Sequence, residues 1–361
     1  MVDYNIGVIY GDQGREMALQ VLEEYGLEEK LPEDRNALIV LKPNLVLDSP
    51  AEEGATTDPE IIEGILEYLF DRGWTNIKIM ESSWVGCSTG KAFKVCGYEQ
   101  LATRWDIELV DLKNDSTRKI EIEGETLKVC EQPLRANFII NLPVLKAHCQ
   151  TKMTCALKNM KGCIPDSEKR RYHTEGLHRP IALLNKVINT DFVLVDGIYG
   201  DLTFEEGGNP VKMNRIIFGE DPVLVDLYAA RLLGLQYEDI GYLNYFREDL
   251  LTGLTVNKIN SPKDTIREKD VSRSAKVEKL AEYISSDAAC SSCYGNLIQA
   301  LYRLQEEGIN PQAEIYIGQG YHGRELNGLG IGRCLNGAST FIGGCPPETG
   351  NIVNFLRRKV N

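Results

Sequence analysis

The sequence predicts an α/β fold, in which a largely parallel or mixed sheet is flanked by helices and a smaller cysteine-containing module follows at the C-terminal end. Short aliphatic and β-branched runs alternate with segments of helical periodicity over residues 37–233. Polar loops follow several of the predicted strands, as they do where a sheet presents a binding edge. Residues 290–361 are rich in glycine and contain four of the ten cysteines.

The first elements are a strand, a helix and a second strand. Residues 37–41 form an aliphatic strand that ends at a proline and polar side chains. Asp58 is a suitable N-cap, and Pro59 a suitable first residue, for a helix that runs to about residue 72. Residues 76–80 form the next strand, so the pattern is βαβ.

Later segments repeat this alternation. We expect strands at residues 107–112, 137–142, 192–196 and 215–218, and helices around Leu101 and over residues 181–188 and 222–233. Such an alternation is typical of a largely parallel sheet, whose ligands bind at the carboxyl ends of the strands. The loops that follow the strands are therefore the first candidates for a functional site.

Length and local composition divide the chain. A length of 361 residues favours two domains, or one large domain with an appended module. We expect an α/β domain over residues 1–250, a linker or surface excursion over residues 251–285, where core periodicity is lost, and a Cys/Gly-rich cluster module over residues 286–361. The module should contain a helix over about 295–307 and a strand over 313–317.

The charge balance limits the partners and the location. The chain has 40 Lys and Arg against 53 Asp and Glu, a net charge of −13, which argues against nucleic-acid and anionic-membrane partners. No apolar stretch approaches the roughly 18 residues of a membrane span, and no secretory signal is found. We therefore expect a cytoplasmic protein, whose reduced thiols serve as metal ligands or buried side chains.

Four cysteines form a set with the chemistry of a metal centre. Cys290 and Cys293 form a Cys-x-x-Cys pair. Cys334 and Cys345 follow in a glycine-rich stretch of the sequence, and Cys345 directly precedes a proline. Four soft thiolates suit an iron–sulfur cluster or zinc, and the cysteine–proline pair is familiar from cluster ligation. We favour a [4Fe–4S] cluster, with Zn as the alternative. A redox pair or simple burial of Cys290 and Cys293 is the third interpretation.

A basic segment interrupts the acidic chain. Residues 146–179 contain eight Lys and Arg but only three Asp and Glu, together with three of the four histidines. A segment of this kind directly after a predicted strand suits an anionic small molecule. Within it, the run Lys169-Arg170-Arg171 is interpreted as a solvated basic surface.

The other polar residues of this segment, together with the loop after the first strand, form the predicted Lys/His cleft. Catalysis is assigned to His148, Lys146 and Lys158, and His148 is the first acid–base candidate because histidine changes charge near neutral pH. Substrate binding is assigned to Lys42, Asn44, Asn159 and Lys161. Three acidic residues could orient the cations or cap helices and turns: Asp196, Asp221 and Asp226.

Seven motifs in order carry a resemblance to a known family. They are Lys42-Pro43-Asn44, Ala55-Thr56-Thr57-Asp58-Pro59-Glu60, Glu81-Ser82-Ser83, Leu142-Pro143-Val144-Leu145-Lys146-Ala147-His148, Ala156-Leu157-Lys158-Asn159-Met160-Lys161-Gly162, Val195-Asp196-Gly197-Ile198 and Asp221-Pro222-Val223-Leu224-Val225-Asp226. With them, the chain from Leu38 to Leu235 resembles the DUF362 proteins, a group of uncharacterised function often found in anaerobic bacteria and archaea. Members often carry a ferredoxin-like cluster segment, so the resemblance implies that Cys290 to Cys345 form a variant of it. A more distant similarity to nickel-dependent lactate-racemase-like α/β proteins implies proton or hydride movement on an anionic substrate.

These observations predict an iron–sulfur protein, and within that class an oxidoreductase that acts on an anionic small molecule and exchanges electrons with a redox partner protein. Two alternatives stay open. One is an electron-transfer or scaffold protein that docks an acidic partner through the basic segment. The other is a zinc-containing, non-redox isomerase or hydrolase.

Overall fold

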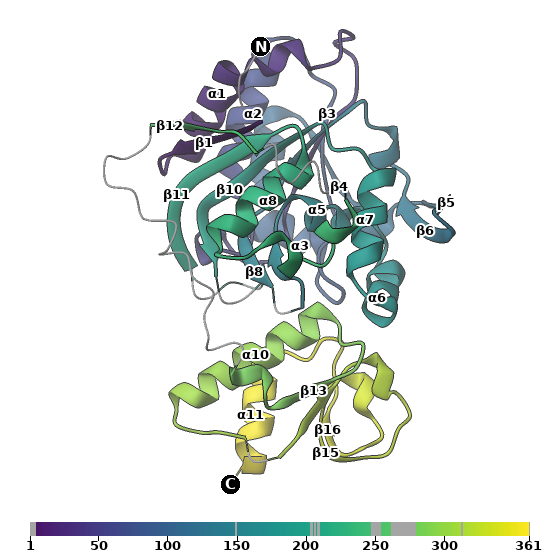
Figure 1. Ribbon diagram of the computed structural model, residues 1–361. Coiled ribbons are helices and arrows are strands. Elements are labelled where there is room, and N and C mark those ends of the chain that lie inside the picture. The colour runs from purple at the N-terminus through teal and green to yellow at the C-terminus, as the bar shows by residue number, and fades with distance from the viewer. Residues whose placement is uncertain are drawn as a thin grey trace.

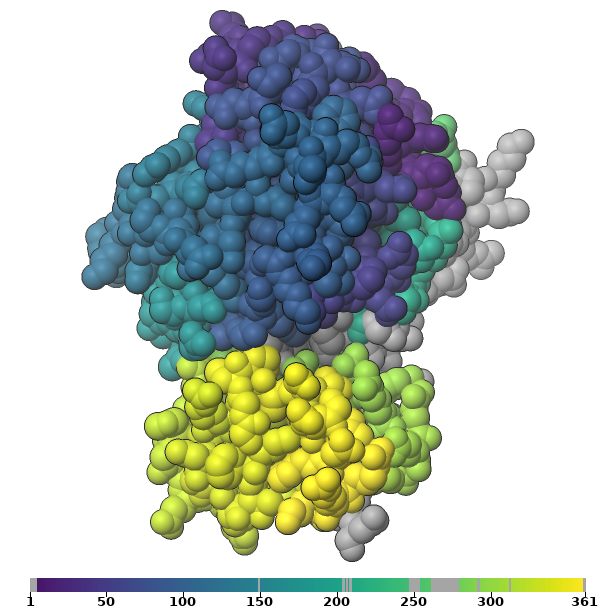
Figure 2. All heavy atoms as spheres, turned by 180° about the vertical axis from the view of Figure 1, so that it is seen from behind, coloured from purple at the N-terminus to yellow at the C-terminus, as the bar shows by residue number. Residues whose placement is uncertain are grey.

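An α/β domain and a smaller C-terminal module make up the molecule. The computed structural model describes residues 5–148, 150–202, 205, 207, 210–246, 254–260, 279–311 and 313–360. In Figure 1 the module lies below the α/β domain, with the N- and C-termini at opposite ends. Seen from behind, the residues coloured yellow-green to yellow gather in a lobe of their own (Figure 2).

An eight-stranded sheet with the order β12-β1-β11-β10-β7-β2-β3-β4 forms the centre of the α/β domain. Its strands are β1 (Ile6–Tyr10), β2 (Ile39–Pro43), β3 (Ile77–Glu81), β4 (Glu108–Asp111), β7 (Phe138–Leu142), β10 (Phe192–Asp201), β11 (Pro210–Gly219) and β12 (Val256–Ile259). Five of the seven neighbouring pairs are parallel, and β11 runs antiparallel to both β1 and β10. The predicted fold class is confirmed.

Helices cover both faces of this sheet (Figure 1). One face packs against α1 (Gly14–Tyr25), α2 (Pro59–Asp71), α3 (Thr89–Val95) and α4 (Tyr98–Trp105), and the other against α5 (Ala156–Asn159), α6 (Asp166–Glu175), α7 (His178–Val187) and α8 (Pro222–Leu232). Successive strand residues therefore enter different cores. In β10, Leu194 lies in the core with α1 and α2, and Val193 in the core with α7 and α8.

The sequence signals fix several of these elements closely. Helix α2 begins as predicted, because the Asp58 side chain accepts the Glu60 amide at 2.9 Å and Pro59 is the first helical residue.

Two antiparallel hairpins stand apart from the main sheet. They are β5 (Thr117–Ile122) with β6 (Glu125–Cys130), and β8 (Lys146–His148) with β9 (Lys152–Thr154).

The C-terminal module has its own sheet and its own core. Four parallel strands lie in the order β13 (Ile284–Ser286), β14 (Ile315–Ile317), β15 (Leu326–Ile331) and β16 (Ala338–Ile342). Helices α10 (Ser291–Glu306) and α11 (Thr349–Val360) pack on this sheet through residues such as Leu301 and Leu356. The glycine-rich stretch thus contains two strands.

Parts of the chain differ from the expected organisation. The expected linker at 251–285 contains β12, which pairs with β1 at the edge of the main sheet, and the start of β13. Only Ile259 of β12 is buried, so this edge strand lacks core periodicity. Residues 251–253 and 261–278 of that linker lie outside the described residues. Helix α1 has no predicted counterpart. Its N-cap residue, Gln13, is not one of the residue types that favour this position.

Candidate functional site

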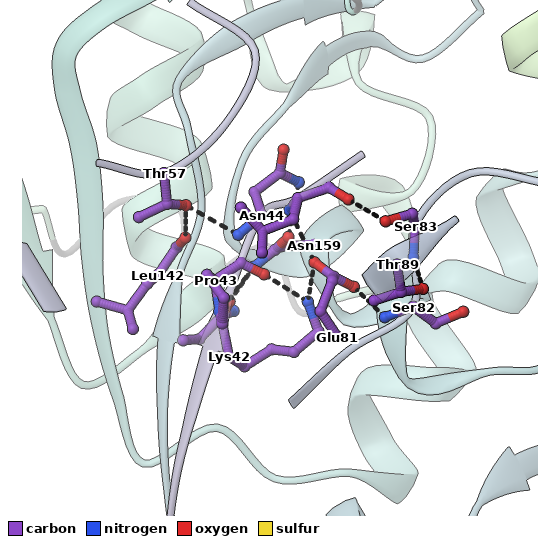
Figure 3. A network of polar contacts seen from close by, with 12 residues as sticks. Lys42, Pro43, Asn44, Thr57, Glu81, Ser82, Ser83, Thr89, Leu142 and Asn159 are labelled. Carbon is purple, nitrogen blue, oxygen red and sulfur yellow. Dashed lines mark hydrogen bonds and ion pairs between the residues drawn. The ribbon is translucent and has the colours of Figure 1, made fainter. Parts of the chain in front are cut away.

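A buried ion pair joins the carboxyl ends of β2 and β3 (Figure 3). Lys42 Nζ donates to Glu81 Oε2 at 2.9 Å and to the Pro43 carbonyl oxygen at 2.7 Å. The two side chains are only 1% and 4% exposed. The ammonium of Lys42, which was predicted to bind substrate, is therefore paired with the Glu81 carboxylate.

Glu81 also holds the loops that follow both strands. Its Oε2 accepts the Leu45 amide at 2.9 Å and its Oε1 accepts the Ser82 amide at 2.6 Å. Gly162 packs directly on the pair, and a Cβ at this position would stand 2.0 Å from Glu81 Oε1 and 2.6 Å from Lys42 Nζ. Residue 162 therefore has to be glycine for the ion pair to form as it does.

Three buried asparagines form a hydrogen-bonded chain that connects α5 to the backbone of Lys42, where Asn159 Nδ2 donates to the Lys42 carbonyl oxygen at 3.1 Å. Asn44 Nδ2 donates to Asn159 Oδ1 at 2.7 Å, and Asn159 Nδ2 donates to Asn141 Oδ1 at 2.8 Å (Figure 3 shows Asn44 and Asn159). Lys146 Nζ donates to Asn44 Oδ1 at 2.9 Å and to the Ala55 carbonyl oxygen at 2.6 Å. The structure thus brings together Lys42, Asn44, Lys146 and Asn159, but as a hydrogen-bonded framework.

Glu205 is the centre of a second buried group. Its Oε2 lies 2.8 Å from His148 Nε2, and its Oε1 pairs with Lys158 Nζ and accepts the Thr154 hydroxyl at 3.3 Å. Burial would raise the pKa of Glu205, but His148 and Lys158 hold it well below its usual range. The predicted catalytic residues His148 and Lys158 therefore share one carboxylate.

The ring of His148 has a defined tautomer. Nδ1 accepts the amides of Gln150 and Thr151, both at 3.0 Å, so the ring proton lies on Nε2 and faces Glu205. Burial lowers the pKa of His148 to about 4, against the opposing charge of Glu205. The imidazole is thus neutral at pH 7, and its predicted role as an acid–base group has to operate through Glu205.

A small, partly enclosed pocket lies beside these groups. It has a cavity volume of about 60 Å³ and is lined by polar residues from the two networks, by the apolar residues Val46, Trp84 and Val85, and by Cys290 of the C-terminal module. Lys158, Lys161 and Lys169 bring basic side chains to its wall. The pocket joins the carboxyl edge of the sheet to the module.

Lys161 is the basic residue of this pocket that is available for a ligand. Among the residues that the structure describes, its ammonium has no hydrogen-bond or ion-pair partner. Burial lowers its pKa to about 7, and the nearby Lys158 ammonium acts in the same direction. Lys42, Lys146 and Lys158, by contrast, all donate to carboxylate, amide or carbonyl oxygens.

The basic segment does not form the solvated surface that we expected of Lys169-Arg170-Arg171. Lys169 is 6% exposed, and its Nζ donates to the carbonyl oxygens of Ser82 and Ser83, both at 2.7 Å. Arg171 pairs with Glu168 and Glu175. Consecutive charges on α6 point in different directions, and Lys169 points inward, so the described residues give no support for a broad basic docking face.

The three aspartates that were candidates for orienting cations serve as caps and loop anchors. Asp221 accepts the Val223 amide at 2.8 Å at the start of α8. Asp196 accepts the amides of Asp58 and Ile198 at 2.9 and 3.0 Å. Asp226 accepts the Ala156 amide at 2.7 Å, at the start of α5.

Replacing Asp226 by alanine is expected to lower the free energy of unfolding by about 2 kcal/mol, because buried amides of α5 lose their acceptor. Burial raises the pKa of Asp226 to about 7, so asparagine is a close substitute for the protonated side chain. Urea unfolding of Asp226→Ala and Asp226→Asn measures both effects. A loss as large for asparagine as for alanine would contradict the capping role.

The four cysteines of the predicted metal centre converge in the module. Cys290 is the N-cap of α10, and Cys293 lies in its first turn. Cys334 and Cys345 follow β15 and β16, and the Arg333 amide donates to the Gly344 carbonyl oxygen at 2.8 Å, which brings their loops together. A Cβ on Gly332 would stand 4.0 Å from Cys293 Sγ, so the Cys334 loop also meets α10.

These thiols affect one another electrostatically. Burial, and then the neighbouring Cys345 and Cys334, raise the pKa of Cys290 to about 11. The pKa of Cys293 is raised by burial and by all three of the other cysteines. Their donor chemistry fits a thiophilic metal or an iron–sulfur cluster. Among the described side chains, however, no three His, Cys, Asp or Glu residues already stand in a metal-binding arrangement.

Polar contacts link the module to the α/β domain around these cysteines. Gln319 Nε2 donates to the Arg170 carbonyl oxygen at 3.1 Å and lies 3.6 Å from Cys290 Sγ. Gln150 Nε2 donates to the Ala289 carbonyl oxygen at 2.8 Å. Gly86 packs on the Cys345–Pro346 peptide, where a Cβ would stand 2.6 Å from the Cys345 carbonyl oxygen. The cysteines therefore lie at the junction of the two parts.

The fold and the pocket define an α/β protein with a basic pocket at the carboxyl edge of its sheet, joined to a small cysteine-bearing module. A family model described as "Domain of unknown function (DUF362)" matches residues 39–231, more than half of the chain. The chain belongs to this family, as the sequence motifs predict. The match ends before the module begins, so the iron–sulfur interpretation of the module stays a prediction.

Two further similarities place the chain among known proteins. The thylakoid-associated protein sll1697 of Synechocystis sp. (strain ATCC 27184 / PCC 6803 / Kazusa) is 28% identical over 205 residues, which cover 55% of this chain and 59% of that protein. The chain thus spans about three-fifths of that relative's length. The lactate racemase apoprotein from Thermoanaerobacterium thermosaccharolyticum aligns with a TM-score of 0.43 and 12% identity, over 64% of this chain and 57% of that one.

No helix in the described ranges combines the length and the apolar character needed to cross a bilayer.

Proposed function

We propose that this protein is a cytoplasmic iron–sulfur oxidoreductase, which binds an anionic small molecule beside a [4Fe–4S] cluster held by Cys290, Cys293, Cys334 and Cys345. The observation that carries the proposal is the position of Cys290. This residue belongs to the gathered cysteines and also lines the pocket that contains Lys161. A ligand on Lys161 would therefore lie next to the metal centre.

The chain's own residues would have separate tasks in this site. Lys161 would bind the anion, because it is the pocket lysine whose ammonium has no partner among the described residues. Lys158 would supply a second positive charge, and the Glu205 carboxylate would keep it in place. His148 would act as a positioning residue for Glu205. When bound, an iron–sulfur cluster supplies one-electron chemistry, with a redox partner protein as the electron source or acceptor.

Metal analysis of anaerobically purified protein tests the proposal. We expect visible absorbance, with about four iron and four sulfide per chain. Cys290→Ser is expected to lose most of the iron and the colour, because a hydroxyl is a poor ligand for the cluster. Stoichiometric zinc in a colourless protein would instead favour the zinc-containing alternative, and iron retained in full by Cys290→Ser would contradict the ligand assignment.

A matched control separates ligand loss from misfolding. Cys96 is buried in the α/β domain, and its Sγ lies 3.1 Å from the Ser49 carbonyl oxygen, to which a serine hydroxyl can also donate. Cys96→Ser is therefore expected to keep its iron. Circular dichroism of both variants should match that of the unmodified protein if the loss of iron in Cys290→Ser arises from ligation.

A further inference from the structure

The size of the pocket limits what can enter it. The cavity volume of about 60 Å³ is less than half of the ~150 Å³ that accommodates benzene in an engineered protein cavity. Aromatic acids and nucleotides are therefore too large to be enclosed. The walls that set this size are well fixed, because Glu81, Lys158 and Lys169 each make several buried contacts there.

The lining combines one available cation with apolar side chains. Val46, Trp84 and Val85 come from the loops after β2 and β3, which the Trp84 amide joins by donating to the Val46 carbonyl oxygen at 2.9 Å. Lys161 comes from the segment that follows α5. A ligand that uses both needs an anionic group and a short apolar part.

We propose that the pocket binds a short-chain carboxylate, with its carboxylate on the Lys161 ammonium and its short apolar part against Val46, Trp84 and Val85. This inference rests on the proposed function, since it takes this pocket as the substrate site. An inorganic oxyanion such as nitrate would contact the ammonium but would gain nothing from the apolar residues.

Calorimetric titration with a graded set of anions tests this assignment. Formate, acetate, propionate, butyrate, benzoate and nitrate are titrated separately into the full chain, both as metal-free protein and after cluster reconstitution. We expect acetate and propionate to bind most tightly and benzoate to bind at least about tenfold more weakly, because the aromatic ring exceeds the cavity. Nitrate should also bind more weakly than propionate.

Two substitutions connect the binding to the residues. Lys161→Gln is expected to weaken acetate binding by about tenfold or more, because it removes a charge-assisted hydrogen bond. Lys91→Gln is the matched control, since Lys91 is an exposed lysine that pairs with Asp48 outside the pocket, and acetate binding should not change. Val85→Ala removes two methyl groups from the lining and should improve butyrate binding relative to acetate.

Each outcome separates this inference from the proposed function. Benzoate binding as tightly as acetate, nitrate binding as tightly as propionate, or unchanged acetate binding by Lys161→Gln would overturn the carboxylate assignment. Acetate binding that depends on Lys161, in a protein that takes up no cluster, would uphold the assignment and overturn the proposed function. Cluster uptake without binding of any carboxylate would overturn the assignment alone.

Discussion

Replacing Glu81 by alanine is expected to lower the free energy of unfolding by about 3–5 kcal/mol, because the variant leaves the Lys42 ammonium without its counter-charge in a buried site. The amides of Leu45 and Ser82 lose their acceptor as well. Urea unfolding at pH 7, followed by circular dichroism, measures the change. Of the ion pairs described above, this one is the most completely removed from water.

A surface pair provides the matched control. Glu67 pairs with Arg15, and the two side chains are 27% and 52% exposed. Glu67→Ala should therefore cost less than about 1 kcal/mol. If Glu81→Ala and Glu67→Ala lowered the free energy of unfolding by similar amounts, burial would not make the Lys42–Glu81 pair more important for stability than a surface pair. The double variant Lys42→Met with Glu81→Leu should regain part of the stability, because no uncompensated charge remains.

The contribution of His148 to the free energy of unfolding is expected to fall as the pH falls from about 6.5 to about 4. In the unfolded chain this histidine takes up a proton near its ordinary pKa of 6.5, whereas burial lowers the pKa to about 4 in the folded protein. At this residue the unfolded state therefore binds more protons within this window, so the His148 contribution falls as the pH falls. Asp226 contributes in the opposite direction, because burial raises its pKa to about 7. The difference between the two pKa values of His148 corresponds to ~3 kcal/mol, at about 1.36 kcal/mol per pKa unit.

The neighbours of His148 act on its pKa in opposite directions. Glu205 favours the protonated ring, Lys158 and Lys161 oppose it, and burial outweighs each of them. Urea unfolding at several pH values between 4 and 7 measures the slope. Compared with the unmodified protein, His148→Gln should lose less stability, or gain more, as the pH falls. Substitution of the exposed His322 by glutamine should leave the slope unchanged. An identical slope in His148→Gln and in the unmodified protein would refute the assignment.

Much of the fold can be predicted because its signals are local. The proline and aspartate at the start of α2 specify that helix end, and the buried strands of the parallel sheet are apolar over most of their length. β15 and β16 lie in glycine-rich text, where Gly328 and Gly330 leave room for the Tyr316 ring and for Phe341. From the sequence alone, such glycines predict loops. The side chains that require glycine here lie on neighbouring segments of the fold, which the local sequence does not reveal.

The composition of the candidate site could be predicted better than its internal roles. The basic segment and the loops that follow β2 and β3 do meet at one pocket. Which of its lysines is available to bind a ligand depends on partners that are far away in the chain. Lys158 is paired by Glu205, which lies 47 residues further on, and Lys42 by Glu81, 39 residues further on. Glu205 has no sequence signal of its own. The burial of Lys169 could not be predicted from the charged run in which it lies, because the orientation of the helix decides which residue of that run faces inward.

Strand β12 has a consequence for how the chain matures during synthesis. It pairs with β1, and the Asn5 amide donates to the Thr255 hydroxyl at 3.0 Å, 250 residues away in the sequence. On a ribosome, the N-terminal strand would have to wait for both β11 and β12 before its two edges are covered. The α/β domain is therefore complete only when translation has passed residue 259. We expect pulse-labelled nascent chains to become protease-resistant only after that point, as is typical of contacts with large sequence separation.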